Sequence, residues 1–195
     1  MVLNAIQINH QAQVIEKLLN EDIKKALRLV NDMEKKGIIG KYAIGGAIGT
    51  IYWTEAYSTK DLDLFLRLPV SSGGLSLMPF MSYLAEKGYP FSAQYLKIGT
   101  LMVDFVGVYN PLTEEALDNA VEVTVYGVHT RVFRSEHLAA IALQTGRVQD
   151  IEKVSRLYRE SNLDEKCFEK IIKEHNLSRR WNDFKKRYIQ ADKRI

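Results

Sequence analysis

The stretch STKDLDLFLRL, residues 58–68, places two carboxylates at the start of an otherwise apolar run. Leucine recurs at every second position from Leu62 to Leu68, a period that predicts a β-strand. Asp61 and Asp63 then point to the same face of that strand, where like charges repel each other. Either the pair is solvated at an exposed strand edge, or it is held together to bind a divalent cation.

A third carboxylate favours the cation. Asp104 is the single charge in LMVDFVGV, residues 101–108, which reads as another strand. Such a charge is costly to bury unless it is paired or bound to a metal, and a structural acid with a backbone or basic partner is the alternative. Mg²⁺ takes one or two protein carboxylates and completes its shell with water and substrate phosphates. Asp61, Asp63 and Asp104 are therefore the candidate metal ligands.

A glycine pair upstream of the acids adds a candidate phosphate site. In AIGGAIG, residues 43–49, a short apolar strand ends and a helix begins. Gly45 and Gly46 would let the backbone approach a phosphate, and the first N–H groups of a helix can bind an anion. The order strand, Gly-Gly, helix, acidic strand and second acidic strand predicts a nucleotide site beside the metal site.

The remaining sequence predicts an α+β fold with a mixed β-sheet flanked by helices and followed by a C-terminal helical region. The expected division is a core with an N-terminal helix at 1–134 and a helical region at 135–195. The elements expected from periodicity, glycines and caps are helices at 9–36, 75–87 and 110–120, a loop at 69–74, strands within 90–109 and 121–133, and helices from Ser135 onward.

Composition sets broad limits on the chain. Its 195 residues suit one compact domain, and 46% hydrophobic residues argue against long disorder. The single cysteine, Cys167, excludes an intrachain disulfide. The first residues lack a signal-peptide pattern, and no apolar run reaches the roughly 20 residues that span a bilayer, so we expect a cytoplasmic protein.

Residues 44–46 (IGG) followed by residues 61–63 (DLD) resemble the first motif of nucleotidyltransferases with the polymerase-beta-type fold. Within that superfamily, STKDLDLFL is similar to the AbiEii-type abortive-infection toxins and their stand-alone relatives. SEHLAAIALQTGRVQD, residues 135–150, matches a helical segment of the same group. The resemblance covers roughly residues 41–157.

This resemblance implies Mg²⁺-dependent transfer of a nucleoside monophosphate from an NTP, such as ATP, to a hydroxyl. Asp61, Asp63 and Asp104 would hold two Mg²⁺ ions, and Asp104 could also be the general base. The implied nucleotide contacts are Gly45, Gly46, Thr59, Lys60 and Arg147. The family's acceptors include RNA, proteins and small molecules, and a toxin of this kind would have a cognate antitoxin.

Two positions depart from the family pattern. Tyr57 and Ala142 stand where the family often has Arg and Lys, and Lys60, Arg67, Lys97 or Arg147 are candidates to compensate. A degenerate protein that binds a nucleotide or a partner without turnover is therefore an alternative, as is an antibiotic or other small-molecule nucleotidyltransferase. For Arg147 itself, a salt bridge to Asp150 is an equal alternative.

The C-terminal segment is basic, with eight Lys or Arg against three Asp or Glu between residues 173 and 195. Basic side chains beside Trp181 and Tyr188 suit RNA phosphates and unstacked bases, so a tRNA is the leading candidate acceptor. The alternative is a solvated helix whose aromatic side chains dock on the domain. The four histidines show no ligand spacing and are interpreted as structural or surface residues.

Overall fold

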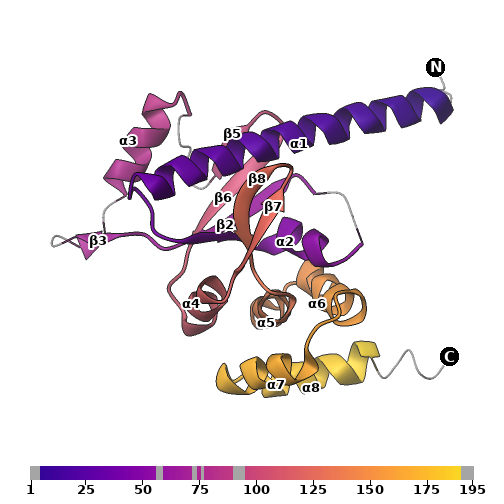
Figure 1. Cartoon of the computed structure of the whole chain (residues 1–195). Coiled ribbons are helices and arrows are strands. Elements are labelled where there is room, and N and C mark those ends of the chain that lie inside the picture. The colour runs from indigo at the N-terminus through magenta and orange to yellow at the C-terminus, as the bar shows by residue number, and fades with distance from the viewer. Residues whose placement is uncertain (1–4, 56–58, 72–73, 76, 90–94, 190–195) are drawn as a thin grey trace.

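The computed structural model describes residues 5–55, 59–71, 74–75, 77–89 and 95–189. A six-stranded mixed sheet lies between two layers of helices (Figure 1), in the strand order β5-β6-β2-β1-β8-β7. Its strands are β1 (Tyr42–Ile44), β2 (Asp61–Leu66), β5 (Tyr95–Ile98), β6 (Leu101–Gly107), β7 (Val121–Val125) and β8 (Val128–Val132). The α+β architecture predicted from the sequence is confirmed.

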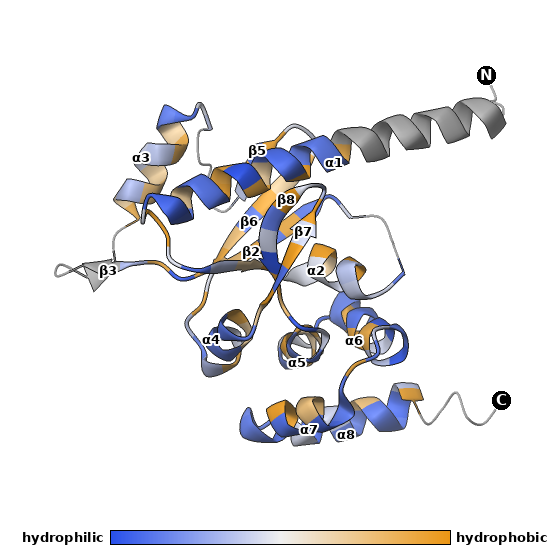
Figure 2. Cartoon of the chain, viewed as in Figure 1, coloured by the Kyte–Doolittle hydropathy of each residue, from blue (hydrophilic) through white to orange (hydrophobic). Residues whose placement is uncertain are grey.

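The helices divide between the two faces of the sheet. Figure 1 shows α1 and α3 on one side and α4 to α8 on the other. The helices are α1 (Ala5–Lys35), α2 (Gly46–Trp53), α3 (Met78–Glu86), α4 (Pro111–Asp118), α5 (Ser135–Thr145), α6 (Val148–Glu160), α7 (Glu165–Glu174) and α8 (Ser178–Phe184), with a π-helical turn at Lys185–Ile189. Figure 2 shows the apolar strands between helices whose outer faces are hydrophilic.

Alternation along β2 separates the core from the acidic face. Leu62, Leu64 and Leu66 are almost fully buried in a hydrophobic core shared with α1 and α3. Their neighbours point the other way, where Phe65 packs with Phe133 in a second core formed with α4, α5, α6, α7 and α8. The strand period predicted from the leucines is therefore the period that the fold uses.

Several local predictions need correction. The expected loop at 69–74 contains a two-stranded ribbon, β3 (Val70–Ser71) with β4 (Gly74–Leu75). The helix expected from Leu75 begins only at Met78, because Leu75 belongs to β4. Helix α5 does begin at Ser135, but Arg134 is its N-cap residue and no side chain caps it. For the strands expected within 90–109, residues 90–94 lie outside the described residues.

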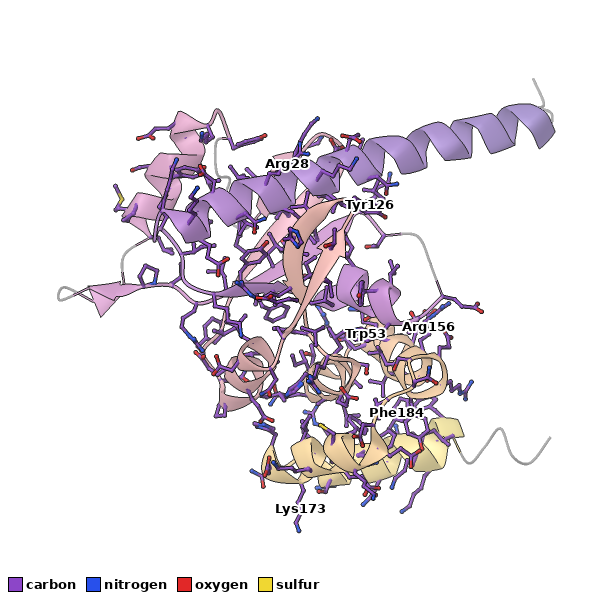
Figure 3. The ribbon with its side chains drawn as sticks, in the orientation of Figure 1. Arg28, Trp53, Tyr126, Arg156, Lys173 and Phe184 are labelled. Carbon is purple, nitrogen blue, oxygen red and sulfur yellow. The ribbon has the colours of Figure 1, made fainter. Side chains whose placement is uncertain are left out.

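The C-terminal helices pack through an aromatic cluster rather than lying free in solvent. Trp181 is only 5% exposed and contacts Tyr158, Phe168 and Phe184. Phe184 lies at the inner side of this layer, whereas Lys173 points away from the domain (Figure 3). The docked alternative for the aromatic residues is thus correct for Trp181, which cannot stack on an RNA base.

Within the part of the chain that the structure describes, no helix is both long enough and apolar enough to cross a membrane.

Candidate active site

Three carboxylates predicted to act together come to one face of the sheet. β2 and β6 are parallel, and their register places Asp63 directly beside Asp104 and Asp61 beside Met102. Residues paired in this way point to the same face, and Asp61 shares that face with Asp63 because it is two positions away. Asp61 is exposed, while Asp63 and Asp104 are half-buried. The sheet therefore aligns the acids along two neighbouring strands.

The glycine pair forms the wall next to Asp63. Gly46 has a φ of +54°, and a Cβ atom there would lie 1.6 Å from Asp63 Oδ2. At Gly45, a Cβ atom would lie 2.5 Å from the ring of Phe65. Gly45 also donates its N–H to the Asp63 carbonyl at 2.9 Å. The close approach of backbone and carboxylate at this point requires glycine.

The electrostatics of Asp104 show no stabilising partner for its charge among the described residues. Burial raises its pKa, and the negative charges of Asp63 and Asp61 raise it further. No contribution from the described residues lowers it. Among the described residues, the charges that act on Asp104 are therefore like charges, as expected for a carboxylate held beside other acids.

The negative charge of Asp63 is partly offset by neighbouring groups. Burial raises its pKa, while the charge of Lys153 and a hydrogen bond from the Ala47 N–H lower it. Ala47 lies in the first turn of α2, where backbone donors have no partner within the helix. Asp61 raises the pKa of Asp63 and Arg147 lowers it, both to a smaller extent. The start of α2 and the cations of α6 thus face the same carboxylate.

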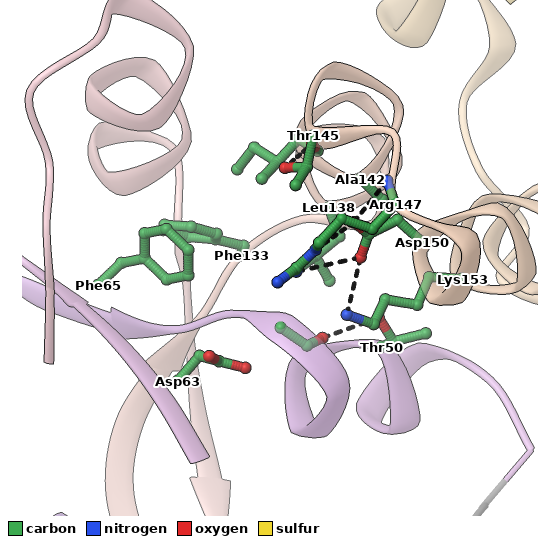
Figure 4. A pocket seen from close by; sticks show the side chains of 12 residues that line it. Thr50, Asp63, Phe65, Phe133, Leu138, Ala142, Thr145, Arg147, Asp150 and Lys153 are labelled. Atoms are coloured by element: carbon green, nitrogen blue, oxygen red, sulfur yellow. Dashed lines mark hydrogen bonds and ion pairs between the residues drawn. The ribbon is translucent and has the colours of Figure 1, made fainter. Parts of the chain in front are cut away.

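Helix α6 supplies two cations, Lys153 and Arg156, that the sequence analysis does not predict, beside the predicted Arg147 at its N-cap. A cleft of about 450 Å³ is lined by the three acids and by Arg147, Lys153 and Arg156. Lys153 Nζ lies 3.1 Å from Asp150 Oδ1, and its side chain is only 17% exposed. Figure 4 shows Lys153 and Arg147 meeting at Asp150, with Asp63 across a smaller adjoining cavity. The available signal was the three-residue spacing from Asp150, which places Lys153 on the same helix face.

The other predicted nucleotide contacts are placed unequally. Thr59 lines the cleft and accepts a hydrogen bond from the Asp61 N–H at 3.2 Å. Lys60 is exposed and is not among the residues that line the cleft. Arg147 lines the cleft, and its Nε lies 2.8 Å from Asp150 Oδ2, so the salt-bridge alternative is correct, while nucleotide contact stays a prediction.

The structure also places some of the residues that could compensate for the family's missing Arg and Lys. Arg67 is held at the far end of β2 by Glu114 and Asp118. Ala142, where the family often has Lys, lines the small cavity of about 90 Å³ that Lys153 also lines. Lys153 and Arg147 therefore bring cations to the cavity in which Ala142 supplies none. Tyr57 lies outside the described residues.

The donor chemistry fits Mg²⁺ only with help from a substrate. Among the described residues, no group of three or more His, Cys, Asp or Glu side chains is placed to hold a metal ion. The acidic face offers carboxylate oxygens, which are the ligands that Mg²⁺ prefers, and Mg²⁺ needs only one or two of them when phosphates complete its shell. The in-register carboxylates of Asp63 and Asp104 meet that requirement.

No protein-family model and no curated protein sequence matches the chain. Its fold is similar to that of an antigenic nucleotidyltransferase-like protein from Paracoccidioides brasiliensis, with a TM-score of 0.53 and 13% identity over 72% of this chain and 75% of that one. Two structures of the antibiotic-resistance factor ANT(2'')-Ia each give a TM-score of 0.49. Their identities are 12% and 13%, over 88% and 84% of this chain and 97% and 99% of theirs. The similarity to the Paracoccidioides brasiliensis protein shows that the chain has a nucleotidyltransferase-type fold.

Proposed function

We propose that this protein is a Mg²⁺-dependent nucleotidyltransferase that moves a nucleoside monophosphate from an NTP to a hydroxyl acceptor. The observation that carries the proposal is the pairing of Asp63 with Asp104, next to a glycine wall and opposite the cations of α6. The acids could bind Mg²⁺, and the glycine wall and the cations could bind the phosphates of an NTP. Like charges placed side by side do not stabilise the fold, so together these features favour a functional site.

The nucleotide occupies the cleft between the acidic face and α6. Lys153 and Arg147 lie where they can exchange part of their interaction with Asp150 for the phosphates. Gly46 and the first turn of α2 approach the same phosphates, because Gly46 has no side chain and the helix start carries positive partial charge. Asp61 and Asp63, together with Asp104, would hold Mg²⁺, which when bound offsets the charge of the triphosphate and favours ionisation of the acceptor hydroxyl.

Asp104 accepts the proton in this scheme. The acceptor oxygen attacks the α-phosphorus, an O–P bond forms, and the bond from the α-phosphorus to the bridging oxygen breaks. Pyrophosphate leaves with that electron pair, and the hydroxyl proton passes to Asp104. Asp104 lines the cleft beside Asp63, which places its carboxylate where the acceptor hydroxyl would bind.

The test is a comparison of wild type with Asp63→Asn. We expect one NTP to stabilise the wild type only in the presence of Mg²⁺, by about 2.7 kcal/mol at a hundredfold excess over Kd. Asp63→Asn abolishes this stabilisation, whereas the control Asp183→Asn, at an exposed position on α8, retains it. If no NTP stabilises the protein with Mg²⁺, or if Asp63→Asn behaves as wild type, the proposal is wrong.

A nucleotide-binding protein without turnover is the second candidate. It is favoured by the engagement of Arg147 and Lys153 with Asp150, which leaves both cations already paired. Pyrophosphate release separates the candidates, because a binder shows Mg²⁺-dependent stabilisation by an NTP and forms no pyrophosphate at any acceptor concentration.

The resemblance to AbiEii-type proteins supports a toxin-like role for the same activity. Expression of the wild-type chain is then expected to slow growth, and Asp63→Asn is expected to remove the effect. Relief by a co-expressed neighbouring gene would identify the antitoxin. Normal growth at a level of wild-type protein that is active in vitro would contradict the toxin role.

A further inference from the structure

A second cavity meets the acids from the side of α3 and α4. This groove has a volume of about 1300 Å³ and shares Asp63, Asp104 and Arg147 with the cleft between the acidic face and α6. The two spaces therefore join at the carboxylates. If the nucleotide lies in the cleft, as proposed above, the acceptor hydroxyl reaches the α-phosphorus from the groove.

The walls of the groove are mainly apolar, and several of these side chains are exposed. Tyr109 is 82% exposed, Leu77 is 47% exposed and Met81 is 41% exposed. Phe80 and Phe105 also line the groove and contact each other edge to face, with ring centroids 4.9 Å apart. Apolar surface of this extent beside a polar site is typical of a binding groove for an apolar ligand.

The charges of the groove do not suit a polyanion. Its described lining residues include two arginines and three acids, Asp63, Asp104 and Glu114, a formal charge of 2 − 3 = −1, and they include no lysine. Arg67 lies 3.1 Å from Asp118 and also bonds Glu114, while Arg147 is bonded to Asp150. Binding of single-stranded nucleic acid needs a positively charged groove that follows the phosphates, whereas the described lining of this groove carries a net negative charge.

The part of the groove that runs along β2 to Arg67 is long enough for a small organic acceptor. From Asp63 to Arg67 the chain advances four residues, about 13 Å at the rise of a β-strand. This length suits a molecule of two or three rings, with its hydroxyl at Asp104 and its body along Phe105 and Met81. Asn110 lines the groove near Glu114 and offers polar contact at the far end.

We propose that the groove binds the acceptor, and that the acceptor is a small, uncharged, hydroxyl-bearing molecule with an aromatic or aliphatic body. The proposal rests on the nucleotidyltransferase function for the reaction, but the binding itself can be measured without turnover. It differs from the sequence-based expectation of a tRNA acceptor, and the test below decides between the two.

Two methionines on the same helix provide a matched test. Met81 lines the groove, whereas Met78, which is 66% exposed, is not among its lining residues. The neutral fluorophore N-phenyl-1-naphthylamine serves as the binding probe, and 2-naphthaleneethanol and mixed tRNA serve as acceptors for labelled NTP. We expect Met81→Lys to weaken probe binding at least tenfold and Met78→Lys to leave it unchanged, with Leu77→Lys as a second groove variant.

The added lysine distinguishes the two classes of acceptor by the sign of its effect. Met81→Lys lowers labelling of an apolar acceptor, whereas it raises labelling of tRNA if the groove binds a polyanion. Equal probe binding by all variants, or tRNA labelling that Met81→Lys increases, overturns the proposal. Mg²⁺-dependent stabilisation by NTPs is measured on the same samples. Its absence, with probe binding retained, contradicts the nucleotidyltransferase function and leaves the apolar groove established.

Discussion

Replacement of Gly46 by alanine tests whether the glycine wall and Asp63 form one unit. The new Cβ atom would lie 1.6 Å from Asp63 Oδ2, 2.4 Å from its Cγ and 2.9 Å from its Cβ. Ordinary contacts between such atoms are about 3.5 Å, so the carboxylate must move by more than 1 Å or the backbone must shift. We expect the Asp63 side chain to rotate away from the register position beside Asp104.

The expected loss of stability has two parts. An L-residue at the φ of +54° costs roughly 1–2 kcal/mol, and forcing a side chain out of a packed position costs roughly 1–3 kcal/mol more. Gly88 offers a control, since its φ is +77° and a Cβ atom there would meet nothing within 4 Å. Gly88→Ala should therefore show the backbone cost alone.

A double-mutant cycle measured by urea unfolding separates the parts. In an Asp63→Ala background the Oδ2 and Cγ contacts are gone, so Gly46→Ala should cost roughly 1–3 kcal/mol less than it does in wild type. Gly88→Ala should cost the same in both backgrounds. If the coupling between Gly46 and Asp63 is zero, or if Gly46→Ala retains Mg²⁺-dependent binding of NTP, the wall does not position the carboxylate.

Three further variants test the charge balance and the packing. Lys153→Met is expected to weaken Mg²⁺–NTP binding by about tenfold, or ~1.4 kcal/mol, in a calorimetric titration, with the exposed Lys166→Met unchanged. Burial and the neighbouring acids raise the pKa of Asp104 above 3.8, so the folded state holds this proton more tightly than the unfolded state and loses stability as pH rises through the folded pKa. Asp104→Asn should therefore melt higher than wild type at neutral pH without Mg²⁺, and a lower or equal melting temperature would contradict the repulsion. Trp181→Ala should lower the free energy of unfolding by roughly 3–5 kcal/mol, because the indole is buried, and a loss under 1 kcal/mol would mean that the C-terminal helices dock by other contacts.

The local part of the site could be predicted from the sequence, because it depends on short-range pattern. Alternation around Asp63 gave the face on which it lies, and the apolar neighbours of Asp104 marked it as unusual. The pairing of these two residues joins positions 41 apart, and no local rule sets that register. The ribbon of β3 and β4 was missed for a related reason, since strands of two residues carry almost no periodic signal.

Long-range packing also decided which cations face the acids. The family motifs indicate both Arg147 and Lys60 as nucleotide contacts, but of these two only Arg147 lines the cleft. In the sequence, only the three-residue spacing from Asp150 sets Lys153 apart from the other basic residues of an amphipathic helix. Its role follows from the placement of α6 beside α2, which turns this one helix face toward Asp63.

The repulsion at the acidic face is itself an argument for function. A fold selected only for stability would replace Asp104 with a neutral residue, because the described residues provide no interaction that lowers its pKa. The chain instead places Asp63 beside it in register and presses Gly46 against Asp63, so that the carboxylate cannot move away on that side. Lys153 offsets part of the charge from across the cleft, and its other partner is Asp150. An arrangement that keeps like charges together, with cations close enough to reach an anion between them, is most stable when a cation and a phosphate group are bound, which is the state that the proposed reaction requires.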